Sequence, residues 1–135
     1  MARDVKGIPY KMVRVSDTIN ENPKQGFMPR IARRGTVSTD LIVEKLADAS
    51  SFTGADIHGV IRGLTEQIET HLKLGYNVTI EGLGTFSLAA EGIIVEKEGD
   101  IRANSIKVKR VVFKNASSFL KRFANAVFQK QESKS

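Results

Sequence analysis

Residues 75–86 read Gly-Tyr-Asn-Val-Thr-Ile-Glu-Gly-Leu-Gly-Thr-Phe, and this stretch decides the fold. Gly75 ends a long helical pattern, and the β-forming residues 77–80 predict a short strand. A Gly-Leu-Gly turn at 82–84 then leads into a second strand, so a helix runs directly into a hairpin. Two glycines at this spacing supply a positive φ, or room for another stretch of backbone to pass closely. Such a pair is also typical of an ordinary turn, so its meaning depends on the flanking sequence.

The residues before this hairpin predict two helices. The first begins after a cap at Ser38 or Thr39 and stops near residue 50. Thr53 and Asp56 have the spacing of a capping box, which starts a second, amphipathic helix of about five turns. The centre of the chain is therefore a helix pair followed by a hairpin.

Residues 10–15 and 27–33 predict two strands near the N-terminus, separated by a loop at 17–26 that is rich in Asn, Pro and Gly. Pro29 cannot donate to a ladder, so the second strand should lie at a sheet edge or contain a bulge. Three arginines lie on or just after it: Arg30, Arg33 and Arg34. They are candidates for phosphate contacts. Arginines are also typical of an edge strand that is protected from pairing with other edges, and the pattern favours that role.

The residues after the hairpin predict further strands and one last helix. The hairpin strand ends near residue 90, residues 92–97 predict another strand, and Gly99-Asp100 marks a turn. Residues 105–113 predict a strong strand with one apolar face and one mostly cationic face, because Ile106, Val108 and Val112 alternate with Lys107, Lys109 and Val111. The final helix should be capped by Asn115 and bury a stripe made of Ala116, Phe119, Leu120, Phe123 and Val127.

Composition narrows the class of protein. The chain has 135 residues, the length of one domain with a real core, and no cysteine, which excludes disulfides and thiolate metal sites. Its two histidines, His58 and His71, are isolated and do not make a zinc centre. No stretch has the apolar length of a signal peptide or a membrane span. We therefore expect a soluble cytoplasmic protein without a cofactor, metal, membrane partner or small-molecule substrate.

The net charge is +6, and its distribution is uneven: both ends are basic and the middle is acidic. Residues 106–122 contain no acidic residue and six basic ones: Lys107, Lys109, Arg110, Lys114, Lys121 and Arg122. Such a block is typical of a surface for a polyanion, because each neutralised phosphate releases condensed counterions. A solvated face that keeps the protein soluble is the alternative interpretation.

The order of elements resembles the HU/IHF class of bacterial histone-like DNA-binding proteins. Residues 38–86 are similar to that family without a gap, above all in the motif Gly82-Leu-Gly-Thr-Phe86, and Phe113-Lys114 resembles the Phe-Lys that opens the family's last helix. Residues 1–37, with Tyr10-Lys-Met-Val, resemble a longer HU-related branch that is typically described as DNA-binding. The resemblance covers most of the chain.

The resemblance implies an α+β fold: two helices, an antiparallel sheet with an arm, and a short C-terminal helix. Extra N-terminal strands complete it. Residues 1–36 would be a β extension packed on the core, residues 37–130 the HU-like domain, and residues 131–135 a frayed tail. Two subunits would intertwine as a C2 homodimer, because one subunit leaves too much apolar area uncovered. The expected dimer core consists of Ile61, Leu64, Ile68, Leu83, Phe86 and Phe113.

The implied function is non-enzymatic binding of double-stranded DNA in the nucleoid. In HU and IHF a proline at the arm tip wedges between bases. Here residues 91–102 hold no proline, and Glu91, Glu96, Glu98 and Asp100 outnumber Lys97 and Arg102. We therefore expect phosphate contacts with little sequence selectivity and without a sharp proline-driven bend. The candidate DNA-binding residues are Lys107, Lys109, Arg110, Lys114, Lys121, Arg122, Arg30, Arg33 and Arg34.

Two rival functions follow from other features. The acidic arm and the N-terminal strands favour an HU-like scaffold for protein–protein assembly, with weak or no DNA binding. Enzyme activity has the least support, because no catalytic set of side chains has a usable spacing. Gly82 and Gly84 also lack the third glycine and following helix of a dinucleotide fingerprint.

Overall fold

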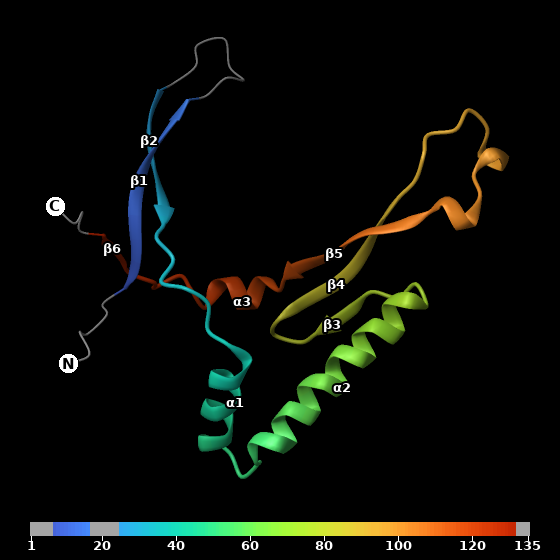
Figure 1. Ribbon diagram of the computed structural model, residues 1–135. Helices are drawn as coiled ribbons and strands as arrows, with labels where there is room; N and C mark the ends of the chain where they lie inside the picture. Colours follow the sequence, from blue (N-terminus) through green and yellow to red (C-terminus); the bar gives the residue numbers. More distant parts are fainter. Residues whose placement is uncertain (1–6, 17–24, 132–135) are drawn as a thin grey trace. The chain divides into compact units, whose positions relative to one another are not determined.

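The computed structural model describes residues 7–16 and 25–131 and divides the chain into two compact units. One contains the described residues of Met1–Val37 and Ala124–Ser135, and the other contains Ser38–Phe123. The architecture is mixed α+β, as expected (Figure 1). Most of the predicted loop at 17–26, and all of the predicted frayed tail at 131–135 except residue 131, fall outside the described residues.

The first unit is a three-stranded sheet in the order β2-β1-β6. Strands β1 (Ile8–Ser16) and β2 (Gln25–Ile31) are antiparallel, and both confirm the N-terminal strands expected from the sequence. Pro29 lies in β2, an edge strand, where a missing N–H is tolerated. The third strand, β6 (Phe128–Lys130), runs parallel to β1 and has no counterpart in the sequence analysis.

The second unit begins with the two expected helices. Helix α1 (Thr39–Asp48) is capped by Ser38, whose Oγ accepts a hydrogen bond from the Leu41 amide at 3.4 Å. Helix α2 (Gly54–Lys73) starts with the predicted capping box: the Thr53 amide donates to the Asp56 carboxylate, and the Asp56 amide donates to Thr53 Oγ, both at 3.1 Å. Two otherwise unsatisfied amides at the helix start are thereby satisfied.

The glycine-bracketed turn forms as expected between β3 (Val78–Ile80) and β4 (Gly84–Glu91). Gly82 has a φ of 80°, which favours glycine, and the Leu83 amide donates to the Ile80 carbonyl at 3.0 Å. Gly84 serves the other purpose, close approach: a Cβ there would meet the Lys114 carbonyl oxygen and lie 2.7 Å from the Phe113 ring. The two glycines therefore act for different reasons.

Strand β5 (Lys107–Asn115) completes an antiparallel sheet in the order β3-β4-β5, with α2 packed against β3 and β4. Beyond β3, β4 and β5 continue together as an arm (Figure 1). Its end, residues 92–106, contains the short 3₁₀ helices η1 (Glu98–Asp100) and η2 (Ala103–Ser105). The strand expected at 92–97 is wrong, because the β4–β5 ladder ends at Glu91 and leaves no partner beyond it.

The C-terminal helix is much shorter than expected. Helix α3 (Ser117–Lys121) has Ala116 at its N-cap and no side-chain cap, so the prediction that Asn115 caps it is wrong. The Asn115 side chain instead donates to the Ala116 carbonyl at 3.1 Å. The expected helical stripe through Val127 is also wrong: the Val127 carbonyl accepts from the Ile8 amide at 2.7 Å, beside the start of β6. Strand pairing across the chain overrides the local helical pattern.

The hydrophobic core of the described chain is small. Among the described residues, the buried hydrophobic side chains are Val43, Ile57 and Leu72. They lie where α1 packs on α2 and at the end of α2 that leads into the hairpin. Much of the remaining apolar surface of the second unit is therefore open.

Candidate nucleic-acid interface

A β-bulge in β5 decides which side chains share a face of the sheet. Leu88 pairs with Val111 and Ala90 pairs with Val108, so Lys109 is an extra residue without a partner on β4. An extra residue shifts the alternation of side chains by one position on either side of it. Val108 and Val111 consequently lie on the same face, although strict alternation would separate them.

The expected division of β5 into faces is therefore wrong. Val108 and Val111 both line a groove beside α2, whereas Val112 lies on the opposite face. That opposite face carries Lys107, Arg110 and Lys114. The predicted apolar set of Ile106, Val108 and Val112 does not share one face, because the bulge lies inside it.

We call Lys107, Arg110 and Lys114 the cationic row. All three are exposed, and they extend over roughly 20 Å of strand. Their neighbours on β4 are Glu91, Ala89 and Thr85, so one carboxylate faces the row, at its arm end. The ion pairs among the described residues are His58–Asp40 and Lys73–Glu69, and the row takes part in neither. Its charge is available to an anion.

The other predicted cations lie in several places. Lys109 is exposed at the bulge, and Lys121 and Arg122 are exposed at the end of α3, which follows β5 directly. Arg30 belongs to the first unit, where it lies opposite Lys11 across β1 and β2. Both side chains are exposed, and the sequence analysis missed Lys11 because only the strand register reveals this pairing.

Arg33 and Arg34 follow β2 in the first unit and are exposed. Arg34 has a structural contact, since its Nη2 donates to the Gly7 carbonyl at 3.2 Å. The nine candidate DNA-binding residues are thus divided between the two units.

The arm end is acidic, as its sequence indicates. Glu96, Glu98 and Asp100 are all exposed there, two of them in η1. Ile94 is fully exposed, at 102% of its reference area. Carboxylates at the arm end are unfavourable next to phosphate, whereas an exposed apolar side chain such as Ile94 can contact another protein.

The expected dimer-core residues of α2 line one groove. Ile61, Leu64 and Ile68 form its helical side and Phe86 lies on the sheet side, around a volume of about 560 Å³. Leu64 keeps 42% of its area exposed. The lining is almost wholly apolar, so water in this groove is replaced most favourably by other apolar side chains.

The other two expected dimer-core residues lie near the hairpin turn. Leu83 is 36% exposed and Phe113 is 42% exposed. The Phe113 ring meets the Phe86 ring edge to face, with centroids 5.0 Å apart. This cluster is open on one side, like the groove beside α2.

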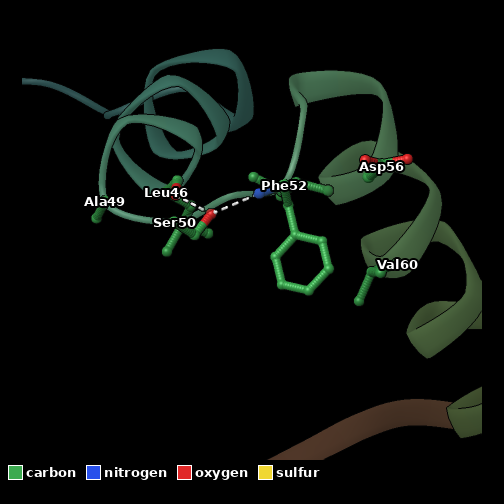
Figure 2. A pocket seen from close by; sticks show the side chains of 7 residues that line it. Leu46, Ala49, Ser50, Phe52, Asp56 and Val60 are labelled. Atoms are coloured by element: carbon green, nitrogen blue, oxygen red, sulfur yellow. Dashed lines mark hydrogen bonds between the residues drawn. The ribbon is translucent and has the colours of Figure 1, made fainter.

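Sequence reasoning missed a second apolar hollow, of about 390 Å³, where α1 turns into α2 (Figure 2). Phe52 projects into it with 62% of its area exposed. Ser50 holds the turn: its Oγ donates to the Leu46 carbonyl at 2.7 Å and accepts from the Phe52 amide at 3.3 Å. The available signal was a phenylalanine directly before the helix cap, a position that often makes a hydrophobic contact.

The described residues of the site offer charge and apolar contact. Among residues 7–16 and 25–131, no group of three His, Asp or Glu side chains is placed to hold a metal ion. Within the same residues no helix has both the length and the apolar character needed to cross a membrane. Among the described carboxyl groups, that of Asp56 has a clearly shifted pKa, because hydrogen bonds from the backbone and side chain of Thr53 lower it.

Comparisons with known proteins agree with this architecture. A family model named HU-HIG, described as an HU domain fused to wHTH, Ig, or glycine-rich motif, matches residues 7–130. A crystal structure from Bacteroides vulgatus ATCC 8482, described as a "putative bacterial DNA binding protein", is similar with a TM-score of 0.65 at 14% sequence identity. The similarity covers 91% of this chain and 48% of that one, so this chain spans about half of that protein. No curated protein matches the sequence.

Proposed function

Since the chain belongs to the HU-HIG family, we propose that it is a non-enzymatic, nucleoid-associated protein that binds duplex DNA as a homodimer. The observation that carries the proposal is the cationic row, three unpaired cations on one face of β5. The description of the B. vulgatus protein as DNA-binding supports the same function. Binding is mainly to phosphates and has low sequence specificity.

The row suits phosphates better than bases. Lysine and arginine on an extended strand can follow a phosphate backbone, which carries one charge per about 1.7 Å of duplex axis. Phosphate contacts fix the position of a protein on the duplex but carry no sequence information. The acidic arm end lacks the proline wedge and is repelled by phosphate, so it does not bend the duplex in the HU manner.

Dimerisation follows from the open apolar surface. The groove beside α2 and the Leu83–Phe113 cluster leave apolar side chains exposed to water, and exposed apolar surface of this kind is typical of an interface between protein chains. A second copy related by a two-fold axis covers this surface and doubles the number of cationic rows. Both rows then bind one polyanion, which raises the affinity without new contact types.

The test is a fluorescence anisotropy titration of the intact chain with a duplex of arbitrary sequence at several salt concentrations. We expect the affinity to fall steeply as salt rises. Arg110→Glu should reduce the slope of log K against log salt by about 0.9 for each phosphate that the variant no longer neutralises. Lys45→Glu on α1 is the matched charge reversal outside the row and should change the slope little. Absence of binding at low salt, or equal effects of the two variants, contradicts the proposal.

One observation favours a second candidate function, protein–protein assembly. Ile94 is fully exposed beside the carboxylates of the arm end, a combination suited to a cationic protein partner. This function predicts assemblies larger than a dimer in light scattering. A dimer whose size does not change with salt or concentration argues against it.

A further inference from the structure

The sheet β2-β1-β6 gathers aromatic rings on one face. Tyr10, Met12 and Arg14 alternate along β1 and therefore share a face. Across the ladder, Phe27 pairs with Arg14, so its ring lies on the same face at the far end. On the other side of β1, the rings of Tyr10 and Phe128 meet edge to face with centroids 6.4 Å apart. We call this surface the ring face.

The rings are accessible in the described unit. Phe27 keeps 66% of its area exposed and Phe128 keeps 55%, while Tyr10 is half-buried. The described side chains of this sheet include none that is buried. From Tyr10 to Phe27 the ring face extends over about 13 Å of strand, which is room for more than one flat ligand ring.

The charged side chains in the described part of this unit are all positive. Its described residues, 7–16, 25–37 and 124–131, include no Asp or Glu. They include six cations: Lys11, Arg14, Arg30, Arg33, Arg34 and Lys130. Arg14 and Lys130 belong to the ring face, since Lys130 pairs with Tyr10. The rings therefore lie between positive charges.

We propose that the ring face of β2-β1-β6 binds single-stranded nucleic acid, a function separate from duplex binding by β5. Exposed bases stack on Phe27 and on the Tyr10–Phe128 pair, and the phosphates lie near Arg14 and Lys130. Aromatic platforms beside cations bind single strands in this way because every base has a face that can stack. A duplex cannot use this surface, since its bases are already stacked on one another.

The charges of the ring face also argue against a second copy of the chain as its binding partner. Two ring faces packed together would bring Arg14 and Lys130 of each copy into one interface without a described carboxylate to neutralise them. Like charges in an interface cost several kcal/mol. A polyanion neutralises the same side chains.

The first experiment uses tyrosine fluorescence as the probe. In a Tyr76→Phe background of the full chain, Tyr10 is the only tyrosine, and the sequence has no tryptophan. We expect an oligothymidylate of about twelve nucleotides, within the size that one such surface covers, to quench the Tyr10 emission at low salt. A hairpin duplex of equal charge should quench it much less. The proposal is wrong if the oligothymidylate and the hairpin duplex quench the Tyr10 emission equally, or if neither of them quenches it.

The second experiment separates stacking from simple apolar contact. Phe27→Leu should weaken oligothymidylate binding roughly five- to 150-fold, the range for loss of one stacked base, whereas Phe27→Tyr should retain it. Met28→Ala is the matched control, because Met28 is an exposed apolar neighbour on the opposite face of β2. Circular dichroism establishes that each variant keeps its sheet.

Three outcomes refute the ring face as a single-strand site: Phe27→Leu binds like the parent chain, Met28→Ala loses as much affinity, or light scattering shows that Phe27→Leu breaks up a self-assembly. The last result identifies a second copy of the chain as the true occupant.

Arg110→Glu distinguishes this proposal from duplex binding. It should weaken the duplex complex and leave the quenching of Tyr10 unchanged, so either function can fail without the other.

Discussion

Replacement of Gly84 by alanine is the sharpest perturbation of the sheet that carries the cationic row. The added Cβ would lie 2.7 Å from two atoms of the Phe113 ring and would also collide with the Lys114 carbonyl oxygen. Ordinary contact distances for such atoms begin near 3.4 Å. The Phe113 ring is 42% exposed and can shift, whereas the Lys114 carbonyl oxygen belongs to the backbone of β5 and cannot turn away by itself. The strands β4 and β5 must separate instead.

The cost has two parts. Overpacking of a fitted site typically costs about 1–3 kcal/mol. Separation of the strands also weakens the ladder near the Gly84–Asn115 pair and the adjacent bond from the Ala116 amide to the Leu83 carbonyl, 2.9 Å long, and one such bond contributes about 1 kcal/mol. We therefore expect Gly84→Ala to lower the free energy of unfolding by about 2–4 kcal/mol.

Urea denaturation monitored by circular dichroism measures this loss, at one fixed protein concentration because a dimer's stability depends on it. Gly99→Ala is the control: no atom lies within 4 Å of its Cβ position, and its φ is not positive, so its effect should stay within about 0.5 kcal/mol. A Gly84→Ala protein as stable as the parent chain would refute the close-approach reasoning.

Two further predictions concern the dimer and the start of α2. Leu64→Glu places a charge in the groove beside α2 and should convert the proposed dimer to monomer in light scattering, whereas Ile94→Glu on the arm should not. The pKa of Asp56 is lowered in the folded chain, so its stabilising effect is complete above the ordinary value of 3.8 and is lost as the pH falls through the folded value. The difference in thermal stability between the parent and Asp56→Asn should therefore shrink on acidification, and a difference independent of pH contradicts this assignment.

The features that the sequence predicts best are local ones. The capping box of Thr53 and Asp56 and the positive φ at Gly82 each depend on a few neighbouring residues. The two helices and the hairpin follow from such signals. The family resemblance adds the expectation of how the two helices and the hairpin are arranged in one fold.

The features that could not be predicted depend on partners far away in the chain. The bulge at Lys109 is a property of the β4–β5 register, and no local signal distinguishes Lys109 from Lys107. Composition therefore identifies the cations of the candidate interface but not the face that each occupies. Likewise, residues 124–130 read as helix, and only pairing with β1 makes Phe128–Lys130 a strand.

The pairing of β6 with β1 has a consequence for how the molecule folds during synthesis. Residues 32–127 separate β2 from β6, and at about 5–20 residues per second the ribosome needs roughly 5 to 20 seconds to make them. The second unit, whose residues are contiguous, is made during that same interval, and its last residue, Phe123, comes just before β6. The edge of β1 that pairs with β6 stays unpaired in the β1–β2 hairpin until β6 is made, because a contact between residues so distant in sequence forms late. A chain that ends before residue 128 and has been released from the ribosome should therefore expose the β1 edge to protease, while it still contains every helix and strand of the second unit.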